Sequence, residues 1–336
     1  MSDIRLSLDT TTAKTLSYTY FKTGRPFIHE IAIRNIGPEE TAGISVRPRV
    51  RVEAPGIPDV IQEWEGQPRE LPRPQTVDPV ELKYNDLRLG INHVALGNLT
   101  DTLLAQIVVE VLDEDDNIVG SSIKDLQILS PKDWVKDFRY PDSLAAFVLP
   151  GAESVQSILK DAREWLAQNK GSGDIAVEDR GFQHTVDVAE AIYESIRHRA
   201  IHYSYEENAD WDAVQRIRTP ADILEKDLSG TCLDTSVLYA ACLLEAHIRP
   251  LIFMVEGHAF AGFLNLDLIK TDIGGELGVD WLKPQEIRQA HSRGWLLSVE
   301  TTLFCGGETS HSFKTACEWQ SMEEDRGNNG YFSFRT

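Results

Sequence analysis

The sequence is poor in positive charge, since 33 lysines and arginines are outnumbered by 53 aspartates and glutamates, giving a formal net charge of -20. A surface that binds nucleic acid needs clustered Lys and Arg to displace the counterions of the phosphates. The charge balance therefore excludes an obvious nucleic-acid partner. The sequence also lacks any apolar run near the ~20 residues that cross a bilayer. Its first residues have neither the basic nor the apolar region of a signal peptide. We expect a cytoplasmic protein with no membrane contact.

Cysteine is also scarce, and the four cysteines form no paired framework: Cys232, Cys242, Cys305 and Cys317. In a reducing compartment disulfides are rare, so each thiol needs an explanation of its own. The stretch that holds Cys305, His311 and Cys317 lacks the close cysteine pairs of structural zinc sites. We predict no metal site there.

The length of 336 residues favours two domains, each with its own apolar core. Residues 1–130 contain short alternating runs separated by Gly, Pro, Asn and Asp, which predicts an all-β antiparallel sandwich of the Ig-like type. Within it, "DEDDN" at 113–117 resembles part of a calcium loop but lacks its central glycine and terminal glutamate, so a hairpin turn is expected. Residues 131–336 mix helical and strand patterns and predict an α+β domain.

Two amphipathic helices are predicted at the start of the second domain. In "SVQSILKDAREWLAQ" the apolar residues recur at intervals of three and four, and "VDVAEAIYESIRH" repeats the pattern. Each helix therefore has one face for a core.

The most informative stretch is "SGTCLDTSVLYAACLLEAHIRPLIFMVEGHAFAGF", from Ser229 to Phe263. Thr231 and Asp234 have capping-box spacing, so a helix is expected to begin beside Cys232 and to be buried beyond its polar first turn. The partial positive charge at a helix N-terminus favours the thiolate form of Cys232. The Asp234 carboxylate opposes this effect, so a cationic partner is needed, and a histidine would serve.

A strand, a turn and a second strand follow the helix, and His258 stands at the first position of the second strand. A third strand, "GWLLSVETT", ends near Glu300. If the last two strands pair antiparallel, Glu300 lies beside the second ring nitrogen of His258. Cys232, His258 and Glu300 then form a nucleophile, a base and an orienting acid.

These motifs, Gly-x-Cys-x-Asp opening a buried helix, Gly-His-Ala opening a strand and an acid-Thr-Thr strand end, resemble the transglutaminase-like superfamily. This is a papain-related fold with a Cys-His-Asp site, and the resemblance covers roughly Leu144 to Trp319. More narrowly, "QRIRTPADILEKDLSGTCLDTSVLYAACLLEAHIRPLIFMVEGHAFAGF" looks like the transglutaminase-like region of large bacterial helicase-associated proteins, some linked to phage defence. The resemblance implies that Cys232 is the nucleophile, His258 the general base and Glu300 the acid.

The chain departs from the family pattern in two ways. It has glutamate where most relatives have aspartate, and an insertion at about 265–294 brings three rival acids, Asp267, Asp272 and Asp280. We prefer Glu300 because a strand end is held more rigidly than a loop. The backbone N–H of Cys232 is the natural first oxyanion donor, and Gln215 is a candidate for the second.

The function expected from this pattern is a peptidase or amidase that acts on a protein or peptide through a thioester, without a metal or organic cofactor. The N-terminal sandwich is a candidate surface for a protein partner. A true transglutaminase and a non-catalytic interaction module are the alternatives. Three aromatic residues, Tyr203, Tyr205 and Trp211, either line a substrate groove or pack between helices, and they receive no role.

Overall fold

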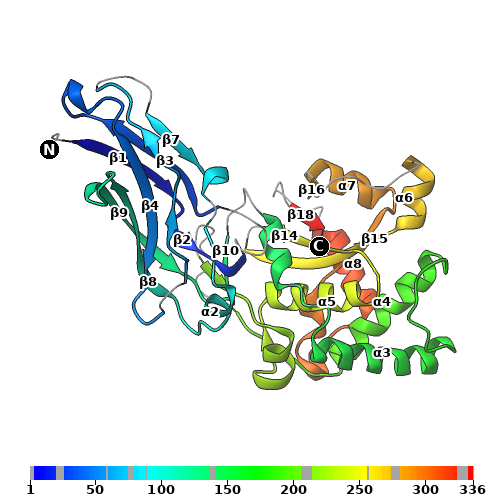
Figure 1. Cartoon of the computed structure of the whole chain (residues 1–336). Helices are drawn as coiled ribbons and strands as arrows, with labels where there is room; N and C mark the ends of the chain where they lie inside the picture. The colour runs from blue at the N-terminus through cyan, green and yellow to red at the C-terminus, as the bar shows by residue number, and fades with distance from the viewer. Residues whose placement is uncertain are drawn as a thin grey trace. The chain divides into compact units, whose positions relative to one another are not determined.

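The protein is an α+β protein with several antiparallel sheets (Figure 1). The computed structural model describes residues 4–19, 26–57, 60–74, 79–87, 89–136, 141–205, 214–255, 257–273, 281–282, 284–323 and 332–335. The chain forms two compact units, Met1–Trp134 and Val135–Thr336, which divide close to the domain boundary expected at residue 130. None of the helices in these ranges is long and apolar enough to cross a membrane.

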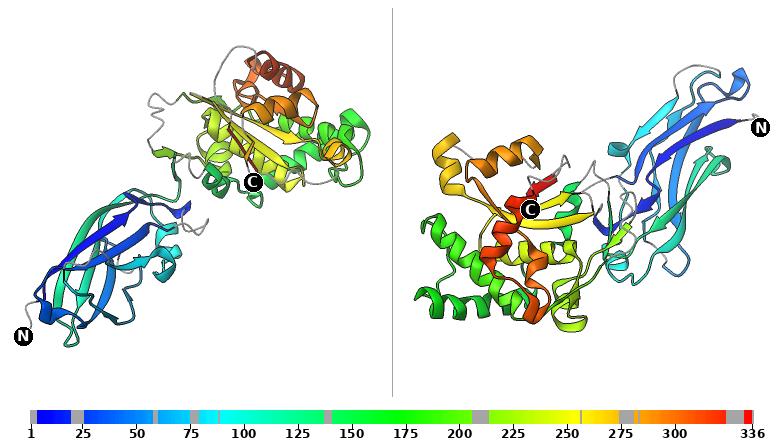
Figure 2. Two further views of the ribbon diagram at one scale, coloured as in Figure 1. Left: turned by 90° about the horizontal axis from the view of Figure 1, so that it is seen from above. Right: turned by 180° about the vertical axis from the view of Figure 1, so that it is seen from behind.

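The first unit contains two sheets, which further views show from above and behind (Figure 2). One sheet has the antiparallel order β1 (Leu6–Thr12), β3 (Ile28–Asn35) and β7 (Val80–Lys83). The other has the order β2 (Thr15–Leu16), β9 (Ile118–Ile128), β8 (Leu103–Leu112), β4 (Ser45–Glu53) and β5 (Trp64–Glu65), with β6 (Arg69–Glu70) also on β4. Its pairs are antiparallel except for β2 with β9. The unit also contains the short helices η1 (Glu39–Thr41), η2 (Tyr84–Asp86) and α2 (His93–Gly97).

Alternating burial is clear in β4, whereas residues 107–112 of β8 are buried without interruption. Ile31 and Ile33 of β3 and Ile107 and Val109 of β8 are buried in one hydrophobic cluster, so both sheets contribute to the same core. Burial of such side chains contributes roughly 1.5–3 kcal/mol each. An Ig-like strand arrangement stays a prediction.

The predicted turn at 113–117 joins β8 to β9. The Asp113 carboxylate accepts hydrogen bonds from the backbone N–H groups of Asp115 and Asn117 and from the Asn117 side chain. Asp116 adopts a positive φ of 65°. A hairpin turn at this position is confirmed, and the acid closes the turn.

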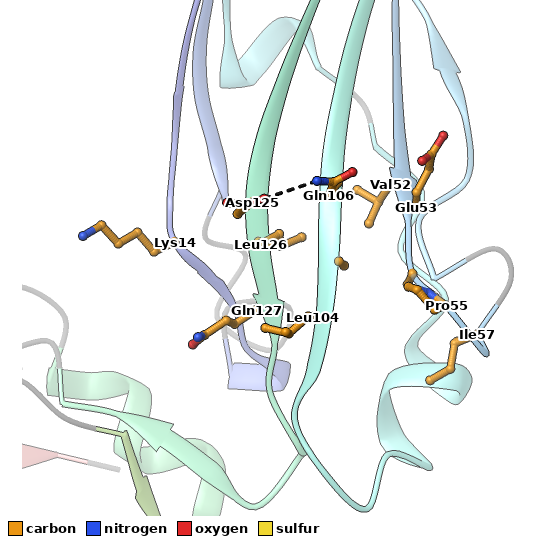
Figure 3. A pocket seen from close by; sticks show the side chains of 12 residues that line it. Lys14, Val52, Glu53, Pro55, Ile57, Leu104, Gln106, Asp125, Leu126 and Gln127 are labelled. Carbon is orange, nitrogen blue, oxygen red and sulfur yellow. Dashed lines mark hydrogen bonds between the residues drawn. The ribbon is translucent and has the colours of Figure 1, made fainter.

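A broad hollow of about 1150 Å³ lies on the first unit, along the ends of β4, β8 and β9 (Figure 3). Its polar side chains include Gln106, whose amide donates to the Asp125 carboxylate at 3.3 Å. The described residues that line it include neither a cysteine nor a histidine. The hollow therefore lacks the cysteine and histidine that the expected acyl transfer uses.

The second unit contains α3 (Glu153–Lys170), α4 (Phe182–Arg197), α5 (Cys232–Glu245), α6 (Leu266–Ile273), α7 (Pro284–Ser292) and α8 (Phe313–Glu323). The two helices predicted from apolar spacing are confirmed as α3 and α4. Shorter elements are η3 (Pro141–Phe147), η4 (Asp222–Lys226), η5 (Thr301–Phe304), η6 (Gly307–Thr309), β11 (His202–Tyr203), β12 (Val214–Arg216) and β13 (Ser229–Gly230), and β10 (Asp133–Val135) spans the division between the units.

The central sheet of this unit has the order β16 (Trp281–Leu282), β18 (Phe332–Arg335), β14 (Pro250–Val255), β15 (His258–Leu264) and β17 (Leu296–Val299). Helix α5 packs against β14 and β15 (Figure 1). A separate hydrophobic cluster joins Phe253 and Phe260 of these strands to Ile269 of α6 and Ile287 of α7. The insertion therefore contributes helices that cover part of the sheet.

Gly262 lets β15 lie close to its neighbours. A Cβ at this position would lie 2.5 Å from the carbonyl oxygen of Leu297 in β17 and 2.8 Å from the Phe253 ring in β14. Only glycine fits between these groups, because real Cβ atoms do not approach so closely. The register that brings the end of β17 to the beginning of β15 depends on this contact.

Candidate active site

Cys232 is the first residue of α5, and Thr231 caps the helix. The Asp234 N–H donates to Thr231 Oγ1 at 3.2 Å, and the Thr231 N–H donates to Asp234 Oδ2 at 3.0 Å. The predicted capping box is confirmed. These two bonds use the N–H groups of Thr231 and Asp234 but not the N–H group of Cys232. Cys232 is in the first turn, where backbone N–H groups point out of the helix.

The Asp234 carboxylate does not stand alone beside the thiol. Its side chain is fully buried and accepts hydrogen bonds from the backbone N–H and the guanidinium of Arg218, both at 2.8 Å. The sequence suggested that Asp234 opposes the thiolate, but the Arg218 charge offsets the carboxylate. Sequence reasoning missed this role of Arg218, although the residue lies within the stretch that carries the family resemblance.

The other polar residues of the first turn are buried, and they connect α5 to the acid-Thr-Thr segment. The hydroxyls of Thr235 and Ser236 donate to the Cys232 carbonyl oxygen at 2.9 and 2.7 Å. Both hydroxyls also lie 3.1 Å from Thr301 Oγ1. The first turn is therefore a buried polar network rather than the polar mouth expected from the sequence. Only Cys232 among these residues is partly exposed.

His258 begins β15, as predicted. Gly257, directly before it, has a φ of 74°, a left-handed conformation that favours glycine in the turn after β14. β15 pairs antiparallel with β17, in the register Ala261 to Val299. This antiparallel pairing is the condition under which the sequence places Glu300 near His258, and it brings the residue after β17 beside the start of β15.

Glu300 is the acid at that position, and it is only 3% exposed. Its Oε2 lies 2.7 Å from His258 Nε2, and its Oε1 accepts from the backbone N–H and hydroxyl of Thr302 at 3.0 and 2.7 Å. Both carboxylate oxygens are thus held by donors, which fixes the plane of the group and the orientation of the imidazole.

The imidazole of His258 also forms a hydrogen bond with the Cys232 side chain. Because Nε2 is engaged by Glu300, we infer that Nδ1 is the ring nitrogen available to the sulfur. Burial lowers the pKa of His258, but the bonds to Cys232 and Glu300 outweigh burial and raise its pKa to about 10. The structure therefore brings the three predicted residues together, and the chain of contacts runs from thiol to imidazole to carboxylate.

The rival acids of the insertion are less suited to contact His258. Asp267 is exposed in the first turn of α6, which follows the end of β15 opposite to His258. A strand of this length spans about 20 Å at roughly 3.3 Å per residue. Asp272 lies further along α6, and Asp280 is outside the described residues. Glu300 is the acid that contacts the imidazole.

A small cavity of about 100 Å³ opens at the thiol. Gln215, the candidate oxyanion donor, lies on β12, is 8% exposed and lines this cavity. Tyr203 also lines it, and its hydroxyl forms a hydrogen bond with Cys232. Tyr205 lines the cavity too, whereas Trp211 is outside the described residues. The sequence pointed to Tyr203 only as one of three aromatic residues upstream of Cys232. It did not show whether Tyr203 lines the site or packs between helices. The other lining residues include Lys136, Leu233, Met254, Val255 and Ala259.

The remaining thiols have environments that disfavour ionisation. Burial raises the pKa of Cys305 and of Cys317 to about 12 each, and burial raises the pKa of Cys242 even further. In the described part of the chain, no group of three or more His, Cys, Asp or Glu side chains could hold a metal ion. Cys232 is thus the cysteine with an imidazole partner.

Comparisons with known proteins add little to this geometry. No family model matches the chain, and no curated protein matches it either. Among solved structures, a family 76 glycoside hydrolase from a bovine Bacteroides thetaiotaomicron strain gives a TM-score of 0.17 at 9% identity. The match covers 72% of this chain and 49% of the hydrolase chain, and at this TM-score it carries no argument about fold or function.

Proposed function

We propose that this protein is a cysteine-dependent acyl-transfer enzyme in which Cys232, His258 and Glu300 act as a triad. The observation that carries the proposal is the bridging imidazole, which bonds to Glu300 at 2.7 Å through Nε2 and to the Cys232 side chain. A core cysteine has no need of a cationic imidazole beside it. A nucleophilic cysteine does, because the imidazolium stabilises the thiolate.

In the proposed reaction, the Cys232 thiolate attacks an amide carbonyl carbon and forms a C–S bond, while the carbonyl electrons move to oxygen. The backbone N–H of Cys232 and the Gln215 side chain are the proposed donors to that oxyanion. When the intermediate collapses, the C–N bond breaks and the leaving nitrogen takes a proton from His258. Water activated by the neutral imidazole then hydrolyses the thioester, which makes the enzyme a peptidase or amidase.

The family assignment is part of the proposal. An N-terminal α5 cysteine, a histidine at the start of β15 and an acid after β17 agree with the transglutaminase-like, papain-related domain that the motifs resemble. The two sheets of the first unit share one core, which supports an Ig-like sandwich there. A protein partner for that unit, a cytoplasmic location and a role in bacterial defence are predictions that rest on the sequence resemblance.

The proposal is tested by acylation with p-nitrophenyl acetate, a small activated ester that needs no specific binding site. We expect a burst of p-nitrophenolate with one acetyl thioester on Cys232 by mass spectrometry. The burst should be absent in Cys232→Ala and unchanged in Cys317→Ala, which removes a half-buried thiol whose pKa is raised. A burst that survives in Cys232→Ala would contradict the assignment.

The fate of the acetyl group separates hydrolysis from transfer. If water resolves the thioester, added primary amines leave the rate of acetyl loss unchanged, as expected for a peptidase or amidase. If a primary amine accelerates the loss and appears as the acetamide, the enzyme is a transglutaminase. A thioester that persists for hours in both conditions would favour the non-catalytic interaction module.

A further inference from the structure

Tyr203 is fixed by backbone hydrogen bonds to the segment that leads directly into the nucleophile. β11 and β13 pair in parallel, with Tyr203 opposite Gly230, two residues before Cys232. The His202 N–H donates to the Leu228 carbonyl at 2.7 Å, and the Ser204 N–H donates to the Gly230 carbonyl at 2.9 Å. These backbone hydrogen bonds fix the position of Tyr203 relative to the segment that precedes Cys232.

The Tyr203 side chain is partly exposed and also contacts the thiol. It is 44% exposed, yet its hydroxyl bonds to the Cys232 side chain inside the cavity that His258 also lines. Burial, with the adjoining Cys232, raises the pKa of the hydroxyl to about 12. The phenol thus keeps its proton at neutral pH and acts as a donor.

A donor in this position has one target before the reaction and another during it. In the resting site it bonds to the sulfur, which carries the negative charge in the proposed mechanism. As the C–S bond forms, that charge moves to the carbonyl oxygen bound to the attacked carbon, about 3 Å from the sulfur. Rotation of the hydroxyl, with a small shift of a half-exposed ring, lets the same proton follow the charge.

We propose that the Tyr203 hydroxyl is a catalytic hydrogen-bond donor that moves from the Cys232 sulfur to the oxyanion as the tetrahedral intermediate forms. The inference rests on the proposed acyl-transfer function and adds a donor to the backbone N–H of Cys232 and to Gln215. No proton is transferred from the phenol: it donates a hydrogen bond in both states, and the leaving group still takes its proton from His258.

Two reactions of the same sulfur separate this role from a structural one. Acetylation by p-nitrophenyl acetate passes through an oxyanion, whereas alkylation by iodoacetamide displaces iodide and forms none. For Tyr203→Phe we expect acetylation to slow by about 10²-fold, the low end of losses on removing one oxyanion donor. Alkylation should change by only a small factor, because the thiolate, His258 and Glu300 remain.

Tyr239→Phe is the matched control, since Tyr239 lies on α5 and its hydroxyl donates to the Ala189 carbonyl at 2.9 Å within the core. It should keep both rates. A second variant replaces Tyr203 by 3,5-difluorotyrosine, which keeps the hydroxyl but ionises more readily. Its acetylation should exceed that of Tyr203→Phe at neutral pH and should fall at a lower alkaline pH than that of the wild type, because an ionised phenolate cannot donate a hydrogen bond.

The outcomes separate this inference from the proposed function. Equal acetylation rates in the wild type and Tyr203→Phe, with a burst that still requires Cys232 and His258, would overturn the Tyr203 role alone. Parallel losses of acetylation and alkylation would also overturn it, because they would indicate a damaged thiolate site. Absence of a Cys232-dependent burst in the wild type would remove the proposed function itself.

Discussion

Replacing Glu300 by glutamine tests the orientation of the imidazole with almost no change of shape. The buried carboxylate accepts from at least three donors: His258 Nε2, the Thr302 N–H and the Thr302 hydroxyl. An amide has one acceptor oxygen and one donor NH2 group. If its oxygen stays on the Thr302 N–H, its NH2 group faces His258 Nε2 and forces the ring proton onto Nδ1, toward the sulfur. If it turns over, the Thr302 N–H is left unpaired.

The first arrangement inverts the His258 tautomer, and the second leaves the buried Thr302 N–H without an acceptor. Both also remove the charge-assisted hydrogen bond between the carboxylate and His258. Each such loss costs roughly 1.5–3 kcal/mol. We expect a loss of about 3 kcal/mol in transition-state stabilisation, which corresponds to roughly a 150-fold slower acylation. The assay is the p-nitrophenolate burst of Glu300→Gln, measured beside thermal unfolding to confirm that the variant is folded.

Asp267→Asn is the matched control because it neutralises the rival acid on the exposed face of α6. It should acylate at the wild-type rate. The reasoning is refuted if Glu300→Gln acylates normally while the Asp267 variant is impaired, since the orienting acid would then lie in the insertion.

Three further predictions follow from the same contacts. Cys232→Ser should abolish acylation with little change in melting temperature. Cys242→Ser, at a fully buried position, should cost about 1–3 kcal/mol of stability and keep Cys232 reactive. A large fall in melting temperature for Cys232→Ser, with acylation retained, would place Cys232 in the core. Arg218→Met should leave the buried Asp234 carboxylate without its ion-pair partner. We expect this change to lower the free energy of unfolding by about 3 kcal/mol and to slow alkylation of Cys232. A variant as stable in urea as the wild type would show that the ion pair is unimportant. Because the pKa of His258 is raised to about 10, the stability that its ion pair contributes is complete below the ordinary pKa of roughly 6.5 and is lost as the pH rises through about 10. The melting-temperature advantage of the wild type over His258→Gln should therefore shrink between these values, and a constant advantage would argue against a charged imidazole.

The elements around the site were predictable because their signals are local. The capping box of Thr231 and Asp234 fixes where α5 begins, and alternation identifies β17 as a strand. From the sequence its antiparallel pairing with β15 is an assumption, and the structure contains this pairing. Once those two facts are known, the contact between His258 and Glu300 follows from strand geometry. The burial of α5 was equally readable from its apolar circumference.

The side chains that modulate the site were not predictable in the same way. Arg218 reaches Asp234 from 16 residues upstream, and no periodicity or motif connects them. Tyr203 approaches Cys232 through the β11–β13 pair, whose strands have two residues each. Pairs so short have no alternation to recognise, so their positions depend on tertiary packing. The burial of Thr235, Ser236 and Thr301 likewise depends on how α5 meets the end of β17.

The central claim is that the Cys232 sulfur is ionised by a bridging imidazole, and brief alkylation with iodoacetamide at neutral pH tests it most directly. Peptide mapping by mass spectrometry reports the extent of modification at each of the four cysteines. The account predicts rapid modification of Cys232 alone in the wild type, and its loss in His258→Ala. Slow and equal modification of all four thiols, unchanged by that substitution, would contradict it.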